Sequence, residues 1–131
     1  MEAEDPAELI EKIRQCCSRE QAILAAYIFG SGAAGRMRAT SDVDVAVWVA
    51  PEHEDDFPFL AFAADLDREC RRTVDLVLLN RAGELLKYQV RRHGRLIFER
   101  DPRRRRQFEV SSRKRFEDFL YLHKRYMRKV L

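Results

Sequence analysis

The sequence predicts one α/β (α+β) domain in which helices flank a small mixed β-sheet. Its 131 residues are about the length of a single domain. Hydrophobic residues make up 46% of the chain and charged residues 36%, which is typical of a globular protein with a buried core. Short runs rich in β-branched residues alternate with amphipathic segments, so the elements can assemble as a sheet covered by helices.

The first predicted helix begins after Asp5. Asp5 can act as its N-cap, with Pro6 at the first helical position and Glu8 as the reciprocal residue of a capping box. An apolar stripe at helical spacing follows, made of Leu9, Ile10, Ile13 and Cys17. This helix therefore has one face to bury against the sheet.

Strands and helices alternate through the middle of the chain. β-branched and apolar runs predict strands at 22–29, 43–49 and 73–79, and a short edge strand at 95–99. Amphipathic segments predict helices at 59–71 and 82–92, with Gly94 as the C′ residue that closes the second one. A glycine-rich turn at 30–35 and an acidic loop at 52–56 complete the core. We expect domain 1–131 to consist of a core at 20–101 and a C-terminal helix at 102–131.

The C-terminal helix is predicted to start at Asp101-Pro102, which repeats the signature of an N-cap followed by proline. Its apolar stripe comprises Phe108, Phe116, Phe119, Leu120, Tyr126 and Val130. We expect this stripe to dock on the domain itself. Interleaved basic and aromatic residues can also stack single-stranded RNA, so nucleic-acid binding through this region is the alternative.

Charge is distributed unevenly along the chain. Residues 1–90 hold 10 Lys+Arg and 17 Asp+Glu, whereas residues 91–131 hold 15 and 5. An acidic body thus precedes a basic C-terminal region that can meet nucleic acid, nucleotide phosphates or an acidic protein surface. Three cysteines without a C-x-x-C motif give no disulfide framework, and no apolar run reaches the length of a membrane span. We therefore expect a cytoplasmic protein rather than a secreted or membrane protein.

The glycine-rich turn fits two patterns. Gly30-Ser-Gly-Ala-Ala-Gly35 matches the G-x-G-x-x-G pattern of dinucleotide-binding folds. Only Arg36–Asp42 separates it from the next strand, which is too short for the crossover helix that two parallel strands require. We therefore favour the second pattern, in which the turn serves the strand that follows it.

That next strand begins with two carboxylates. Asp42 and Asp44 are two residues apart, so they point to the same face of an extended strand. Paired carboxylates suit Mg²⁺, and a preceding Gly/Ser turn offers backbone N–H groups to phosphate. Asp75 is the only charge inside an apolar strand, where burial is costly unless the carboxylate is paired or binds metal. An ion pair of Asp75 with Arg71 or Arg72 is the structural alternative. Together, the three carboxylates and the turn indicate nucleotide chemistry.

The motif Gly30-Ser31-(x3)-Gly35-(x5)-Ser41-Asp42-Val43-Asp44 resembles the signature of the polymerase-β-like nucleotidyltransferase superfamily. The resemblance continues through 74–80 and 94–101, and covers most of the chain from Tyr27 to Asp101. It is most similar to the minimal nucleotidyltransferases (MNT), which are the antitoxins of HEPN/MNT toxin–antitoxin pairs. Relatives often carry arginines in the turn, where this chain has Gly32 and Ala34.

The resemblance implies a polymerase-β-type fold and a magnesium-dependent reaction. It implies that Gly30, Ser31, Gly35 and Ser41 bind the nucleoside triphosphate. It further implies that Asp42, Asp44 and Asp75 ligate two Mg²⁺ ions, with Asp75 also acting as base for the acceptor hydroxyl. All three aspartates would be catalytic.

The acceptor that the resemblance implies is a tyrosine of a partner HEPN RNase toxin, which AMP from ATP would inactivate within a hetero-oligomer. One alternative is a non-catalytic antitoxin that blocks its partner by stoichiometric binding. Nucleotidyl transfer to a small molecule is another, although enzymes of that kind usually carry an additional substrate domain.

Overall fold

One four-stranded mixed sheet forms the centre of the protein, as the sequence predicts. The computed structural model describes residues 5–30 and 42–131. The strands are β1 (Ile23–Phe29), β2 (Val43–Val49), β3 (Val74–Leu78) and β4 (Arg95–Glu99), in the spatial order β3-β2-β1-β4. β1 is antiparallel to β2 and β4, whereas β2 and β3 are parallel. The predicted edge position of β4 is therefore confirmed.

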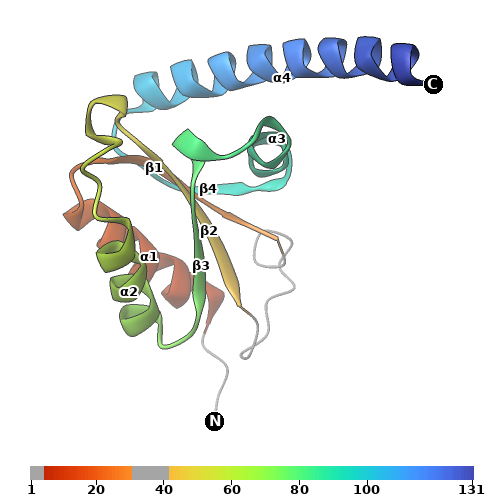
Figure 1. The fold of residues 1–131 in the computed structure, drawn as a ribbon. Coiled ribbons are helices and arrows are strands. Elements are labelled where there is room, and N and C mark those ends of the chain that lie inside the picture. The colour runs from red at the N-terminus through yellow and green to blue at the C-terminus, as the bar shows by residue number, and fades with distance from the viewer. Residues whose placement is uncertain (1–4, 31–41) are drawn as a thin grey trace.

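Helices cover both faces of this sheet (Figure 1). α1 (Pro6–Arg19) and α2 (Phe59–Cys70) pack on one face, and α3 (Glu84–His93) with the first part of α4 (Pro102–Val130) packs on the other. Two short 3-10 turns, at Pro51–His53 and Leu79–Arg81, follow β2 and β3. No helix within residues 5–30 and 42–131 is both long enough and apolar enough to cross a membrane.

The alternation of side chains along β2 divides the core into two layers. Val43, Val45, Val47 and Val49 are fully buried on the α1/α2 side. The residues between them face α3 and α4, where Trp48 is buried and its ring stacks on that of Phe108 at 4.6 Å between centroids. Trp48 thus packs in the core, the role that its aromatic size favours. Asp44 points to this same α3 side of the sheet, because it is two residues before Ala46.

The start and end of α1 show how local sequence and distant contacts combine. Asp5 caps the helix by accepting a hydrogen bond from the backbone N–H of Ala7 at 3.1 Å, and the predicted apolar stripe is buried. The C-terminal end is held by Arg100, which follows β4. Its guanidinium donates to the carbonyl oxygens of Cys17, Ser18, Glu20 and Ile23 at 3.0–3.3 Å. The three cysteines are buried and form no disulfide, so they contribute to packing.

Gly94 closes α3, as the sequence predicts, and it does so as the C-cap residue. Its φ is −77° and its ψ is 163°, which is extended backbone open to any residue. A Cβ at this position would lie 2.4 Å from the carbonyl oxygen of Val90 and 3.4 Å from that of Ile28. Glycine is therefore required here by the close approach of backbone atoms.

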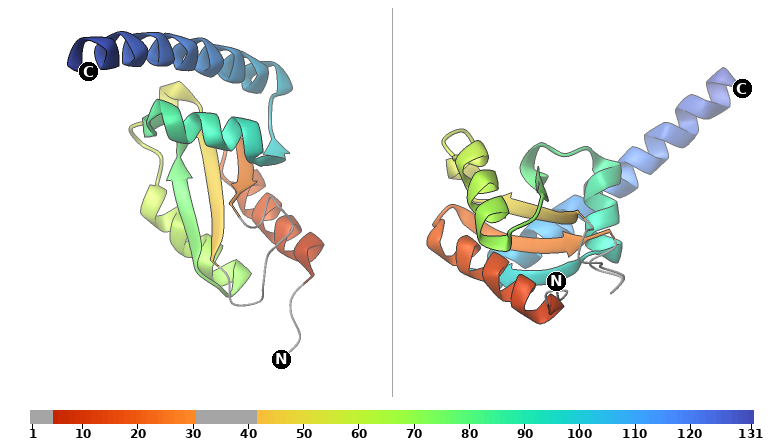
Figure 2. Two further views of the ribbon diagram at one scale, coloured as in Figure 1. Left: turned by 90° about the vertical axis from the view of Figure 1, so that its right-hand side faces the viewer. Right: turned by 90° about the horizontal axis from the view of Figure 1, so that it is seen from below.

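α4 docks on the domain over only part of its length. Ser112 and Phe116 are buried, with 4% and 9% of their surfaces exposed. Farther along the predicted stripe, exposure is 38% for Phe119, 40% for Leu120, 63% for Tyr126 and 59% for Val130. The reason is length: α4 has 29 residues and α3 has 10, or about 44 Å against 15 Å. The prediction that the whole stripe docks on the domain is wrong, because the second half of α4 projects beyond it (Figures 1 and 2).

The basic run 103–106 meets the acidic part of the same chain. Arg104 forms two hydrogen bonds of 3.0 Å with the carboxylate of Glu52, which lies in the predicted acidic loop. This contact lowers the pKa of Glu52 to about 2. Arg105 lies 2.7 Å from Glu99 and 3.0 Å from Glu109. Two of the four arginines therefore fix the start of α4 on the domain.

Candidate active site

Two of the predicted carboxylates lie side by side in neighbouring parallel strands. Asp44 of β2 and Asp75 of β3 are directly paired in the register of the sheet. Paired residues of adjacent strands project to the same face, here the face that carries α3. The sequence motif therefore becomes a spatial cluster through the parallel pairing of β2 with β3.

Asp42 completes the group at the start of β2. It is exposed and precedes the first residue of the strand, whose N–H donates to the carbonyl of Thr73 at 3.2 Å. The pKa of the Asp44 carboxyl is raised, by desolvation first and then by the negative charges of Asp75 and Asp42. The charges of Asp42 and Asp75 are thus close enough to Asp44 to disfavour its ionisation.

Asp75 is exposed, contrary to the expectation that its burial is costly. β3 is an edge strand of the sheet, so one side of it has no neighbouring strand. The desolvation cost that burial would impose on its carboxylate therefore does not arise. An exposed carboxylate at a sheet edge is accessible to a large acceptor molecule.

Gly30 lies against Asp44 at the end of β1. Its φ is +69°, a conformation that favours glycine, and a Cβ there would lie 2.6 Å from Oδ2 of Asp44. The residue before it, Phe29, is paired with Asp44 in the antiparallel register of β1 and β2. The absence of a side chain at Gly30 therefore allows the Asp44 carboxylate to lie directly against the backbone that follows β1.

The fit of these residues to a metal ion rests on the chemistry of the donors. Three aspartates are hard oxygen ligands of the kind that Mg²⁺ binds, and their mutual repulsion is what a divalent cation would relieve. In the part of the chain that the structure describes, no three His, Cys, Asp or Glu side chains are grouped closely enough to form a metal site. Mg²⁺ binding by Asp42, Asp44 and Asp75 is therefore a proposal.

Several residues of the predicted nucleotide site lie outside the described ranges. These are Ser31, Gly35 and Ser41, together with Gly32 and Ala34, where relatives often carry arginine. The antiparallel pairing of β1 and β2 nevertheless excludes the dinucleotide-binding interpretation of the turn, because that fold requires parallel strands at this position.

A cavity beneath α4 was not predicted from the sequence. It has a volume of about 380 Å³ and is lined by residues that include Trp48, Lys87, Gln107, Ser111 and Arg115. Lys87 is only 7% exposed and pairs with Glu84 at 3.5 Å. Lys87 is three residues before the buried Val90, so helical spacing could have predicted that this cation lies on the inner face of α3. The cavity lies toward the far end of β2 from Asp44, so it is separate from the carboxylate cluster.

Comparison with known families gives one match over most of the chain. The family model of polymerase β nucleotidyltransferases matches residues 11–103. This range contains Gly30 and all three aspartates. No curated protein sequence matches the chain.

Several solved structures share the fold. A toxin–antitoxin complex with AMP-PNP has a chain with a TM-score of 0.76 and 23% identity, and the match covers 92% of this chain and 97% of that one. A chain of the MntA–HepT toxin–antitoxin complex gives 0.74 and 22%, covering 95% and 97%. A third is from a Shewanella oneidensis complex of a tri-AMPylated HEPN toxin with its MNT antitoxin, at 0.74 and 20%, covering 96% and 98%. The similarity extends over nearly the whole of each chain.

Proposed function

Because this chain belongs to the polymerase β nucleotidyltransferase family, we propose that it is an antitoxin that transfers AMP from ATP to a tyrosine hydroxyl of a HEPN RNase toxin. The observation that carries the proposal is the register pairing of Asp44 with Asp75 beside Gly30, on the open end of the α3 face. The names of two structural neighbours support ATP as the nucleotide and a HEPN toxin as the partner. One neighbour is a complex with AMP-PNP, and another contains a tri-AMPylated HEPN toxin with an MNT antitoxin.

The three aspartates would hold Mg²⁺, with ATP as the co-substrate. The metal would polarise the phosphoryl oxygens and neutralise charge on the leaving pyrophosphate. Asp44 is the most suitable central ligand, because it is partly desolvated and lies between the other two carboxylates. Its raised pKa favours binding of a cation, which would stabilise the ionised form.

The acceptor hydroxyl would approach from the exposed edge at Asp75. Its oxygen forms a bond to the α-phosphorus of ATP, while the bond from that phosphorus to the pyrophosphate oxygen breaks. The hydroxyl proton passes to the carboxylate of Asp75, and pyrophosphate leaves with the displaced electron pair. The products are AMP-tyrosine and pyrophosphate. An edge strand suits this role, since a protein acceptor is too large to enter an enclosed pocket.

The turn after β1 would hold the triphosphate. Gly30 places backbone close to Asp44, and the adjacent Ser31, Gly35 and Ser41 would supply the remaining hydroxyl and N–H donors. We place the reaction in the cytoplasm. The alternative function is neutralisation of the toxin by binding alone, with a site that performs no chemistry.

Intact mass spectrometry tests the proposal. The HEPN protein encoded next to the gene for this chain is incubated with this protein, ATP and Mg²⁺. We expect one or more additions of AMP to the partner, and none with the Asp44→Asn variant. Peptide mapping locates the modification, which we expect on tyrosine. A partner that is inhibited without any gain in mass would contradict transfer and establish the binding-only alternative.

A further inference from the structure

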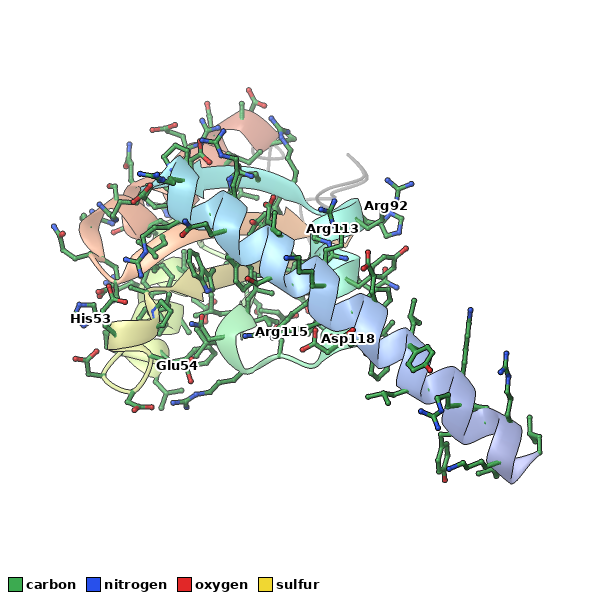
Figure 3. The ribbon with its side chains drawn as sticks, turned by 90° about the horizontal axis from the view of Figure 1, so that it is seen from above. His53, Glu54, Arg92, Arg113, Arg115 and Asp118 are labelled. Carbon is green, nitrogen blue, oxygen red and sulfur yellow. The ribbon has the colours of Figure 1, made fainter. Side chains whose placement is uncertain are left out.

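The second half of α4 presents an apolar face that nothing within residues 5–30 and 42–131 covers. We define the projecting half as residues 119–131, which extend past α3 in Figures 1 and 2 and past the labelled Asp118 in Figure 3. Exposure reaches 62% at Leu122, 63% at Tyr126 and 59% at Val130. Large side chains exposed together on one element mark an interaction surface.

This apolar face continues the contact that docks the first half of α4. Rings stack without interruption from the domain outwards: Tyr88 on Phe116 at 4.3 Å between centroids, Phe116 on Phe119 at 6.1 Å, and Phe119 on His123 at 5.9 Å. At 100° per residue, the apolar and aromatic side chains of α4 that follow Phe116 on its face are those of Phe119, Leu120, His123, Tyr126, Met127 and Val130. We call these six residues the outer stripe. It points in the direction in which α4 contacts α3.

The cations of the projecting half lie outside the outer stripe, while Leu122 extends the apolar surface along one flank. Lys124, Arg125, Arg128 and Lys129 are its only charged side chains, so it carries four positive charges and no Asp or Glu. By helical spacing they lie on the flanks and back of the outer stripe. Tyr121 is also on the back, where the guanidinium of Arg125 lies 5.8 Å from its ring centroid.

This distribution of apolar and positively charged side chains favours one class of partner. Two copies of the projecting half would bring like charges together, which disfavours self-association. Single-stranded RNA stacks on successive aromatic rings that share a face with cations. Within residues 119–131 only Tyr121 lies among the cations, and the other rings lie on the outer stripe. A protein surface with an apolar centre and acidic side chains around it matches both the stripe and its flanks.

We propose that the outer stripe is the docking site for the partner toxin, through an apolar surface that is rimmed by Asp and Glu. This inference rests on the proposed function for the identity of that partner. α3 and the docked part of α4 lie on the same side of the sheet as Asp44 and Asp75. A partner held against the stripe beside α3 is therefore on the side of the sheet where its acceptor must approach.

Two tyrosines provide a matched test. Tyr126 is 63% exposed and in the outer stripe, while Tyr121 is 62% exposed and on the opposite side of the same helix. Binding to the HEPN protein encoded next to this gene is measured by calorimetry in the Asp44→Asn background, so that no transfer occurs. We expect Tyr126→Ser to weaken binding by at least about tenfold, and Tyr121→Ser by less than about twofold. Circular dichroism verifies that both variants fold.

Equal weakening by the two variants, or none by either, overturns the inference. The inference is also overturned if sedimentation shows that the free protein self-associates and that Tyr126→Ser abolishes this self-association. Binding of a single-stranded RNA oligonucleotide that is lost in Tyr126→Ser would assign the stripe to nucleic acid and also overturn it. The mass assay tests the proposed function separately, with Tyr126→Ser made in the chain that retains Asp44. AMP transfer that persists in this variant supports the proposed function whatever the binding result.

Discussion

A side chain at Gly30 would collide with Asp44: its Cβ would lie 2.6 Å from Oδ2 and 3.6 Å from Cγ of that carboxylate. Gly30 directly follows β1, Asp44 lies in the antiparallel neighbour β2, and the backbone of Gly30 has a φ of +69°. The turn and the carboxylate cluster are therefore one structural unit. The following predictions begin with this contact.

Gly30→Ala should abolish AMP transfer and destabilise the fold. The new methyl group must displace the Asp44 carboxylate, and alanine with positive φ costs about 1 kcal/mol or more. We expect a loss of about 2 kcal/mol in the free energy of unfolding, measured with urea. Gly83→Ala is the matched control, because a Cβ at Gly83 has no neighbour within 4 Å. Its loss should stay below about 1 kcal/mol, and equal losses at both glycines would refute the prediction.

Asp44→Asn should remove transfer while stabilising the protein. Burial and two neighbouring carboxylates raise the pKa of Asp44, so ionisation of this group opposes folding. The stabilisation should be absent near pH 3, where Asp44 is protonated in both states. It should grow to about 0.5–1 kcal/mol at pH 7. Urea unfolding at several pH values measures it, with exposed Asp118→Asn as the control. A variant less stable than the native chain at pH 7 would be inconsistent with repulsion in the cluster.

Tyr27→Phe should destabilise the contact between β1 and α4. The Tyr27 hydroxyl is buried and donates to Glu109 Oε1 at 2.6 Å, so its removal should cost about 1–2 kcal/mol. Burial and this carboxylate also raise the pKa of Tyr27 well above its ordinary value of 10.0. The unfolded chain ionises first, so stability should fall as the pH rises through 10, and less steeply in the variant. The exposed Tyr121→Phe should change neither quantity.

Arg100→Lys should destabilise the junction of α1, β1 and β4 by about 2 kcal/mol. The Arg100 guanidinium donates to four backbone carbonyls in a fixed planar arrangement that an ammonium group does not reproduce. Thermal unfolding measures the effect. Arg103→Lys, at an exposed position in the first turn of α4, should leave the melting temperature within about 1–2 °C. Comparable losses of thermal stability in the two variants would show that the backbone contacts of Arg100 stabilise the fold no more than the exposed Arg103 does.

Local sequence was sufficient for most elements of the fold. The bounds of β2 and β4 were predicted correctly, and so were the N-caps Asp5 and Asp101. Such features depend on residues within one or two turns of chain, where periodicity and capping chemistry are decisive. Asp42 and Asp44 were placed together for the same reason. Their assignment to Mg²⁺ and the roles of Ser31, Gly35 and Ser41 remain predictions.

What the sequence determined by itself is therefore the set of elements, their apolar faces and the candidate carboxylates, because each follows from local spacing. The tertiary structure decided how those elements meet. Parallel pairing of β2 with β3 brought Asp75 to Asp44, and the edge position of β3 left Asp75 exposed. The short α3 left half of α4 without a surface to cover it. These outcomes depend on distances between segments far apart in sequence, which the local pattern of residues does not encode.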